Sequence, residues 1–412
     1  MNAGHGLTQK DPSPVPEIDF QGLDDSGTSI PQDVNGSAGP DHLMVTLNTD
    51  VRIMDKGGAP LNTVQTGAFW QGIPGAAGVF DPKISYDPYA DRWIFIMCSS
   101  GNPLSTLVMV GVSETSDPTA NWYLYSFDGD PNDLMFFDYP NFGFNKKWIV
   151  VSGNMVTATP QFGVLYIFNK EDLYTYAQEI EYTRLEVEEG TSLIPSVVMD
   201  EEEEDIYVVN HAGGDVSGVG YLLLRKITGD VSDPVFEEIG FSGIPYPWEE
   251  WNYFTEGDFA PQLGSDQKIN TIDARYQNLV FRNNKLWCAH HIYIPVEDPS
   301  RTAIQWWELD PDGTILQWGR VDDEEEGMMY AFPTIAVNAK EDIMIGFGIF
   351  SAEQYASAVY AFRYEDDPAG TLRDPYQYKD GLAPYYKTFG GARNRWGDYT
   401  STVVDPANDL DF

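Results

Sequence analysis

A hairpin pattern that recurs along most of the chain is the feature that most restricts what this sequence can fold into. Each copy has an apolar strand opened by Pro or Tyr, a polar turn, and a second strand rich in aromatic and β-branched residues. The six copies are FDPKISYDPYADRWIFI from Phe80, DYPNFGFNKKWIVV from Asp138, LIPSVVMDEEEEDIYVV from Leu193, DARYQNLVFRNNKLWCA from Asp273, AFPTIAVNAKEDIMIGF from Ala331 and GDYTSTVVDPANDLDF from Gly397. Internal repetition of this kind predicts a repeat architecture.

Two further strand-like runs follow most copies of the hairpin. Examples are TLVMVGVSE with NWYLYSFD and AIQWWELD with ILQWGRVD, in which apolar and polar residues alternate. Each unit is therefore predicted to be a four-stranded antiparallel meander. Successive units begin roughly 57 to 78 residues apart, and four-stranded units repeated in this way favour blades around a central channel. The predicted fold class is all-β, as a single β-propeller.

The number of blades depends on the two ends of the chain. Residues 30–66 are interpreted as a unit ahead of the first copy, which predicts seven blades, with six as the alternative. The propeller domain is assigned to residues 30–412 and a flexible N-terminal segment to residues 1–29. The last copy stops at Phe412 after two predicted strands, so residues 17–23 are a candidate strand for closing it. A Trp- and Pro-rich insertion near residues 242–272 is expected to be a loop on one face.

Several motifs, in a fixed order, resemble those of a known group of proteins. They are IPQDVNGSAGPDHLMVTLNTDVRI, FDPKISYDPYADRWIFI, GVSETSDPTANWYLYSFD, DYPNFGFNKKWIVV, AIQWWELDPDGTIL and GARNRWGDYTSTVVDPANDLDF. Together they cover about residues 30–412, and the chain resembles a family of bacterial exported β-propeller proteins of undefined function. The resemblance implies export and a propeller fold, and it implies no particular activity. Members of this family are expected to continue with further strands where this sequence ends.

Charge excludes two classes of partner. The chain has 64 Asp and Glu against 24 Lys and Arg, a formal net charge of −40, so its surface repels phosphate backbones and anionic lipid. No nucleic-acid partner is expected and, because no run of 18 apolar residues occurs, no membrane insertion. Excess carboxylates favour calcium, which takes several oxygen ligands; the alternative is that the acidity serves solubility or salt adaptation. No organic cofactor is expected.

The remaining features of the composition concern location and assembly. The implied location is extracellular or on the surface of a bacterium, although the opening residues MNAGHGLTQKDPSPVPE lack the apolar stretch of a signal peptide. Cys98 and Cys288 each lie in an apolar strand-like run, which predicts two buried free thiols. We expect a monomer.

The phase of the repeat brings aspartates to one end of the predicted channel. In a propeller the first strand of each blade lines the channel, and the start of that strand lies at the channel mouth. The aspartates at these positions are Asp33, Asp81, Asp138, Asp273 and Asp398. They predict a ring of carboxylates suited to a hard cation or to acid and base roles in sugar cleavage, and Asp33, Asp81, Asp138 and Asp398 are the candidate metal ligands. The alternative is that each Asp caps its own turn.

The segment RNRWGDY has the densest set of groups that suit a ligand. Arg393 and Arg395 are candidates for binding a carboxylate or sulfate, and Trp396 for stacking on a sugar. Asp398 and Tyr399 are candidate proton-transfer groups. The predicted ligand-binding set also includes Tyr139 and Tyr330. The alternative is that the arginines pair with the aspartates of the channel mouth and that Trp396 is a packing residue.

Histidines supply a further candidate pair. His290 and His291 are neighbours in a predicted strand and therefore point to opposite faces, so they do not bind one metal together in a simple way. Either one, with Tyr293 or Tyr330, suits the base and acid of a polysaccharide lyase. The alternative, a buried structural histidine, applies equally to His211 on the corresponding strand of an earlier unit.

These features predict a binding protein first and an enzyme second. The leading hypothesis is an extracellular binding or adhesion module, calcium-stabilised, that uses the channel mouth for a carbohydrate or protein ligand. The alternative is a polysaccharide-degrading hydrolase or lyase acting on acidic or sulfated glycans. The absence of a recognisable catalytic motif favours the non-enzymatic reading.

Overall fold

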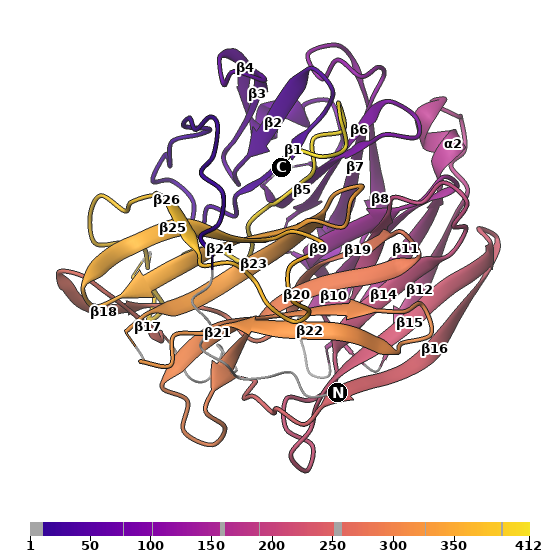
Figure 1. Cartoon of the computed structure of the whole chain (residues 1–412). Helices are drawn as coiled ribbons and strands as arrows, with labels where there is room; N and C mark the ends of the chain where they lie inside the picture. The colour runs from indigo at the N-terminus through magenta and orange to yellow at the C-terminus, as the bar shows by residue number, and fades with distance from the viewer. Residues whose placement is uncertain are drawn as a thin grey trace.

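The computed structural model describes residues 11–76, 78–100, 102–156, 161–188, 190–250, 258–325, 327–388 and 390–412. Most of its strands form six four-stranded antiparallel units (Figure 1). Unit one is β1 (Asn35–Ala38), β2 (His42–Thr46), β3 (Asp50–Asp55) and β4 (Pro60–Gln65). Unit two is β5 (Val79–Asp87), β6 (Arg92–Ser99), β7 (Leu107–Ser113) and β8 (Trp122–Asp128). Unit three is β9 (Phe136–Phe144), β10 (Trp148–Val156), β11 (Phe162–Asn169) and β12 (Tyr182–Val187).

The second half of the chain repeats this arrangement. Unit four is β13 (Ile194–Val198), β14 (Ile206–His211), β15 (Gly220–Asp230) and β16 (Asp233–Ile244). Unit five is β19 (Tyr276–Arg282), β20 (Lys285–Ile294), β21 (Arg301–Leu309) and β22 (Ile315–Val321). Unit six is β23 (Met329–Val337), β24 (Ile343–Ser351), β25 (Gln354–Arg363) and β26 (Tyr376–Lys379). Short helices are α1 (Thr66–Phe69), η1 (Pro103–Ser105) and α2 (Lys170–Tyr174). None of the described helices is long and apolar enough to span a membrane.

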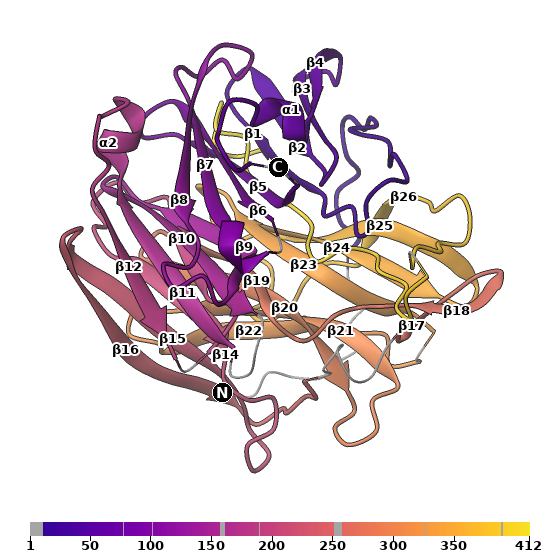
Figure 2. The same cartoon turned by 180° about the vertical axis from the view of Figure 1, so that it is seen from behind.

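The first strand of each unit lies toward a common centre, which gives a propeller-like arrangement (Figures 1 and 2). Consecutive first strands contact one another from β1 through β5, β9, β13 and β19 to β23. At the middle of this series β13 pairs in parallel with both β9 and β19. The all-β class and the four-stranded antiparallel units predicted from the repeat are thus confirmed.

The last copy of the repeat does not form the two strands expected of it. Residues 397–412, all of them described, contain no strand, and residues 398–404 are held by side chains between unit six and unit one. Thr400 Oγ1 donates to the Phe332 carbonyl at 2.8 Å and Ser401 Oγ to the Gly36 carbonyl at 2.6 Å. The Gly346 amide donates to Thr402 Oγ1 at 3.2 Å. The hydroxyl-rich sequence TST thus bonds through its side chains to backbone groups of both neighbouring units.

The N-terminal segment runs over the same junction. Ser13 Oγ donates to the Asp374 carbonyl at 2.7 Å and accepts from the Phe362 amide at 3.0 Å, beside β25. Farther along, the Gly22 carbonyl accepts a hydrogen bond from Arg52 of β3. Residues 17–23, the candidate closing strand, form no strand themselves. Their segment connects unit six to unit one by isolated contacts.

Part of the predicted insertion loop is ordered into a hairpin. The strands β17 (Ala260–Gln262) and β18 (Ser265–Ile269) pair with each other. Asn394 ties this hairpin to the C-terminal region, because its side chain donates to the Lys268 carbonyl at 3.0 Å and its amide to Asp258 at 2.9 Å. Residues 251–257 of the insertion lie outside the described residues.

The core is made where the sheets of neighbouring units face each other. Ile94, Ile96 and Val110 of unit two pack with Phe144 and Val151 of unit three, and similar clusters join the other units. Burial of such side chains stabilises the fold by about 1.5–3 kcal/mol each. The two cysteines are buried in this core as free thiols, as predicted.

Close approach of inner strands requires glycine at one position. In β9, Gly143 faces β13 so closely that a Cβ would lie 2.1 Å from the Ser196 carbonyl oxygen. We predict that Gly143→Ala lowers the free energy of unfolding by about 2–3 kcal/mol, because backbone must move to relieve the clash. Gly67, exposed in α1 with nothing within 4 Å of a Cβ, supplies the matched control: Gly67→Ala should leave urea-unfolding stability unchanged or slightly raised. Equal stability of the two variants would contradict this account.

Candidate functional site

A repeated backbone feature positions the side chains at one end of the channel. In every unit one residue near the start of the first strand has a left-handed backbone. These residues are Asp33 (φ 50°), Asp81 (56°), Tyr139 (54°), Ser192 (53°), Ile272 (53°) and Phe332 (59°). At Asp81 and Phe332 the strand register shifts at the same point, which marks a β-bulge. Such conformations cost about 1–3 kcal/mol each for residues other than glycine and are concentrated at functional sites.

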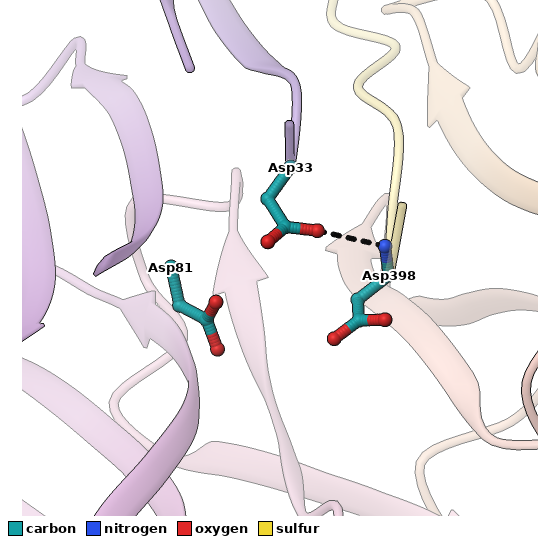
Figure 3. A group of neighbouring side chains, drawn as sticks. All are labelled: Asp33, Asp81 and Asp398. Atoms are coloured by element: carbon teal, nitrogen blue, oxygen red, sulfur yellow. Dashed lines mark hydrogen bonds between the residues drawn. The ribbon is translucent and has the colours of Figure 1, made fainter. Parts of the chain in front are cut away.

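Three aspartates come together at this end of the channel. Asp33, Asp81 and Asp398 each offer an oxygen atom within 4.8 Å of the others (Figure 3), and we call them the carboxylate cluster. Asp33 Oδ1 accepts from the Asp398 amide at 2.9 Å, and its Oδ2 accepts from the Asn48 side chain at 2.6 Å. Asn48 in turn accepts from the Asp81 amide at 2.7 Å. One asparagine between β2 and β3 therefore holds two of the three aspartates in place.

Burial makes the charge of this cluster costly. Asp33 is 1% exposed and Asp81 is 7% exposed. Burial, and next the Asp398 charge, raise the pKa of Asp33 to about 7. Burial, followed by the charges of Asp33 and Asp138, holds the pKa of Asp81 well above its usual range. Burial and the Asp398 charge also raise the pKa of the nearby Asp138 to about 6. Asp33 and Asp81 therefore tend to keep protons at neutral pH, whereas Asp138 is mostly ionised.

Two cationic side chains compensate part of this charge. Arg395 forms an ion pair with Asp398. Lys83 lies two residues after Asp81, with its Nζ 3.4 Å from the centre of the Tyr399 ring. Burial lowers the pKa of Lys83 to about 7, although the charges of Asp81, Asp33 and Asp398 act to raise it.

Asp273, another aspartate of the predicted ring, has a different partner. Arg275 contacts both of its carboxylate oxygens, with Nη2 to Oδ2 at 2.7 Å. Burial acts to raise the pKa of Asp273, but the charge and hydrogen bonds of Arg275, together with the nearby His291, outweigh burial and the pKa is lowered. The same guanidinium lies 4.4 Å from the centre of the Tyr139 ring. Asp273 thus belongs to a neighbouring ion pair and lies outside the cluster of three.

The histidines are buried and face different neighbours. His290 stacks on Tyr276, with ring centres 4.3 Å apart, and its Nδ1 lies 3.0 Å from the Ala274 carbonyl. His291 lies near Phe332, 5.8 Å between ring centres. Burial lowers the pKa of His290 well below its usual range and that of His291 to about 4. Both rings are therefore neutral at pH 7.

Tyr293 and His211, the other residues of the predicted acid–base pairs, are bound locally. The Tyr293 hydroxyl donates to the Ile272 carbonyl and lies 2.7 Å from Thr271 Oγ1. His211 accepts from the Trp248 indole at 2.9 Å, and its Nδ1 lies 3.3 Å from Glu250.

The remaining predicted ligand-binding residues are divided between the channel mouth and the core. Trp396 packs edge-on against Phe350 and Tyr385, with ring centres 5.7 and 4.9 Å away. Tyr330 is buried on Phe347, and Arg393 is half-buried near Asp258. Tyr399 is buried beside Lys83. Asn48, Lys83 and Arg275 were missed by the sequence reasoning, although Lys83 and Arg275 each follow an aspartate of the ring by two residues.

A cavity of about 430 Å³ lies among the inner strands, and Lys83, two residues after Asp81 of the cluster, is on its wall. Its wall includes the inner strands β5, β9, β19 and β23 and the C-terminal residues 400–404. The polar side chains Lys83, Asn141 and Gln277 lie on its wall together with Ile194, Leu279 and Ile335.

Comparisons with known proteins do not assign a family. No family model matches the chain, and no curated protein matches it. Similar solved structures include a GH43 endo-arabinanase from Bacillus licheniformis, at 9% identity, covering 71% of this chain and 96% of that one with a TM-score of 0.34. A D477G ACO/RPE65 chimera is similar at 10% sequence identity; the match covers 90% of this chain and 76% of the chimera, with a TM-score of 0.46. A subtype N10 neuraminidase-like protein of A/little yellow-shouldered bat/Guatemala is similar at 10% sequence identity. That match covers 81% of this chain and 94% of the neuraminidase-like protein, with a TM-score of 0.41. With TM-scores below 0.5, these similarities carry no argument about function.

The raised pKa values predict how stability changes with pH. Between about pH 4 and pH 7 the unfolded chain releases protons that folded Asp33 and Asp81 keep, so without divalent cations stability should fall as pH rises through this window. Asp81→Asn removes one of these groups. We predict that it flattens the profile and raises the free energy of unfolding at pH 7. Urea unfolding in EDTA at several pH values tests this. The exposed Asp266→Asn is the control, and an unchanged profile for Asp81→Asn would refute the prediction.

Proposed function

We propose that this protein is a binding module in which a divalent cation, calcium by preference, is held between Asp33, Asp81 and Asp398. The observation that carries the proposal is the placing of three carboxylate oxygens from distant parts of the chain within 4.8 Å of one another. Calcium takes six to eight oxygen ligands in a flexible geometry, and carboxylates bind it through one or two oxygens. Three aspartates therefore supply a large part of such a shell.

The charge of the cluster supports a cation. Three carboxylates face one ion-paired arginine and a lysine with a pKa of about 7, so full ionisation at neutral pH leaves negative charge without compensation. Protons can neutralise this remaining negative charge, and so can a divalent cation. An ion bound here would connect unit one, unit two and the C-terminal segment, which contribute the three aspartates.

We further propose that the six four-stranded units are the blades of one propeller, closed by residues 398–404 in place of a seventh blade. The contacts that residues 400–402 make with both Phe332 and Gly36 support this closure. The sequence resemblance supports an extracellular or surface location in a bacterium. A carbohydrate or protein ligand and a monomeric state are separate expectations from the sequence, and the proposal includes them.

Calcium should stabilise the protein through this cluster. We predict that millimolar calcium raises the melting temperature by several degrees over the EDTA sample, because only the folded chain assembles the three ligands. Asp81→Asn should abolish the increase, whereas Asp266→Asn should keep it. Since an acidic surface also attracts calcium weakly, all samples contain the same excess of KCl. An equal increase in native protein and Asp81→Asn would refute the cation site.

Acid–base catalysis on a glycan is the second candidate function, and the raised pKa of Asp138 together with the lowered pKa of Lys83 favours it. Two features oppose it. Glycosidases separate their two carboxyl groups by roughly 5–9.5 Å, whereas the cluster oxygens all lie within 4.8 Å. Asp33 and Asp81 are also almost fully buried, where a polymer does not reach them in this conformation.

An activity panel separates the two functions. Acidic and sulfated polysaccharides are incubated with the protein, with calcium and with EDTA, and assayed for new reducing ends and for ultraviolet-absorbing unsaturated products. We predict no release of either product. Release that disappears in a folded Asp138→Asn variant but persists in Asp266→Asn would establish the enzyme instead.

A further inference from the structure

The cavity among the inner strands has three buried nitrogen donors on its wall. They come from three separate strands: Lys83 from β5, Asn141 from β9 and Gln277 from β19. Their exposed fractions are 7%, 4% and 2%. Lys83 and Asn141 each follow a left-handed residue by two positions, and both line this cavity. The repeat therefore brings donors from separate units to one cavity.

None of these donors has a hydrogen-bond partner among the described residues. Asn141 Nδ2 and Gln277 Nε2 are buried without one. The orientation of the Gln277 amide is supported by its Oε1, which accepts from the Tyr139 hydroxyl at 3.3 Å. Lys83 Nζ makes no hydrogen bond or ion pair within the described part of the chain, and its short contact is with the face of the Tyr399 ring. A buried donor without a partner costs about 1–3 kcal/mol, so a ligand that supplies acceptors is favoured.

The rest of the cavity wall combines apolar side chains with hydroxyl groups and with the charged Glu201, Arg282 and Asp409. Ile194, Leu279, Ile335 and Val403 contribute to it, and a volume of about 430 Å³ accommodates a small organic molecule. A ligand that fits has an acceptor group at one end, near the three donors, and an apolar body along these side chains.

We propose that this cavity binds a small carboxylate with an apolar body, its carboxylate held by Lys83, Asn141 and Gln277. A carboxylate satisfies several donors at once and forms a charge-assisted hydrogen bond with the ammonium group. The charges of Asp33, Asp81 and Asp398 act on Lys83, and Arg395 is paired with Asp398. The other charged residues on the cavity wall are Glu201, Arg282 and Asp409. A cation or protons at the carboxylate cluster reduce the repulsion of an incoming anion. The ligand site itself is defined by the donors and does not rest on the cation.

Hexanoate is a suitable probe, and its binding is measured by isothermal titration calorimetry on the full chain, in calcium and in EDTA. We expect saturable binding of one hexanoate. Lys83→Met should weaken it at least tenfold, while Asn141→Leu and Gln277→Leu should each weaken it severalfold. The exposed Lys379→Met is the control and should bind as the native protein does. Melting curves of each variant establish that it is folded.

Other probes decide the chemistry of the head group. Hexylamine, with a cationic head, should not bind, and hexanamide should bind more weakly than hexanoate. Equal affinity of native protein and folded Lys83→Met, stronger binding of hexylamine, or hexanamide as tight as hexanoate would overturn the carboxylate site. No saturable binding of hexanoate would show that the cavity holds water only. If calcium fails to stabilise the protein but hexanoate binds, the cation proposal fails alone; the reverse result rejects only the carboxylate site.

Discussion

Convergence of the inner strands on one centre is the constraint from which the rest of this structure follows. Because each unit contributes its first strand to the same channel, residues far apart in sequence meet there. Gly143 shows how tight the approach is, since β9 and β13 leave no room for a Cβ. The same convergence brings Asp33, Asp81 and Asp398 within 4.8 Å. A repeat that begins its units with Asp therefore concentrates negative charge at one end of its channel.

That charge is compensated in two different ways at neighbouring positions. Asp273 has Arg275 two residues later on its own segment, so the pair is internally neutral and the pKa of Asp273 is lowered. Asp81 also has a cation two residues later. That cation, Lys83, contacts the face of the Tyr399 ring and, among the described residues, forms no ion pair with Asp81. Asp273 is thus part of a bidentate ion pair, whereas burial and the neighbouring carboxylates raise the pKa of Asp81.

How much of this was predictable depends on the range of the interactions involved. Alternation and turn residues are local, so the hairpins, the four-stranded units and the buried thiols of Cys98 and Cys288 were readable from the sequence. Asp33, Asp81 and Asp398 lie close together, as the phase of the aspartates suggested, although Asp398 is in a segment that forms no strand. The conformation of residues 398–404 could not be predicted from the sequence, because their hydroxyl groups donate hydrogen bonds to the carbonyls of Phe332 and Gly36, which are distant in sequence. Nor did periodicity distinguish Lys83 or Gln277, which lie on the cavity, from other polar residues in strands.

The position of Lys83 makes the carboxylate cluster and the cavity interdependent. Its ammonium lies between three carboxylates on one side and the cavity on the other. Charge gained by the cluster on losing its protons favours protonation of Lys83, whereas a divalent cation in the cluster opposes it by repulsion. A carboxylate in the cavity favours the protonated lysine again, because the two then form an ion pair. If the proposed cation and the proposed carboxylate both bind, each changes the affinity for the other through Lys83, and thermodynamic linkage requires that this effect be reciprocal.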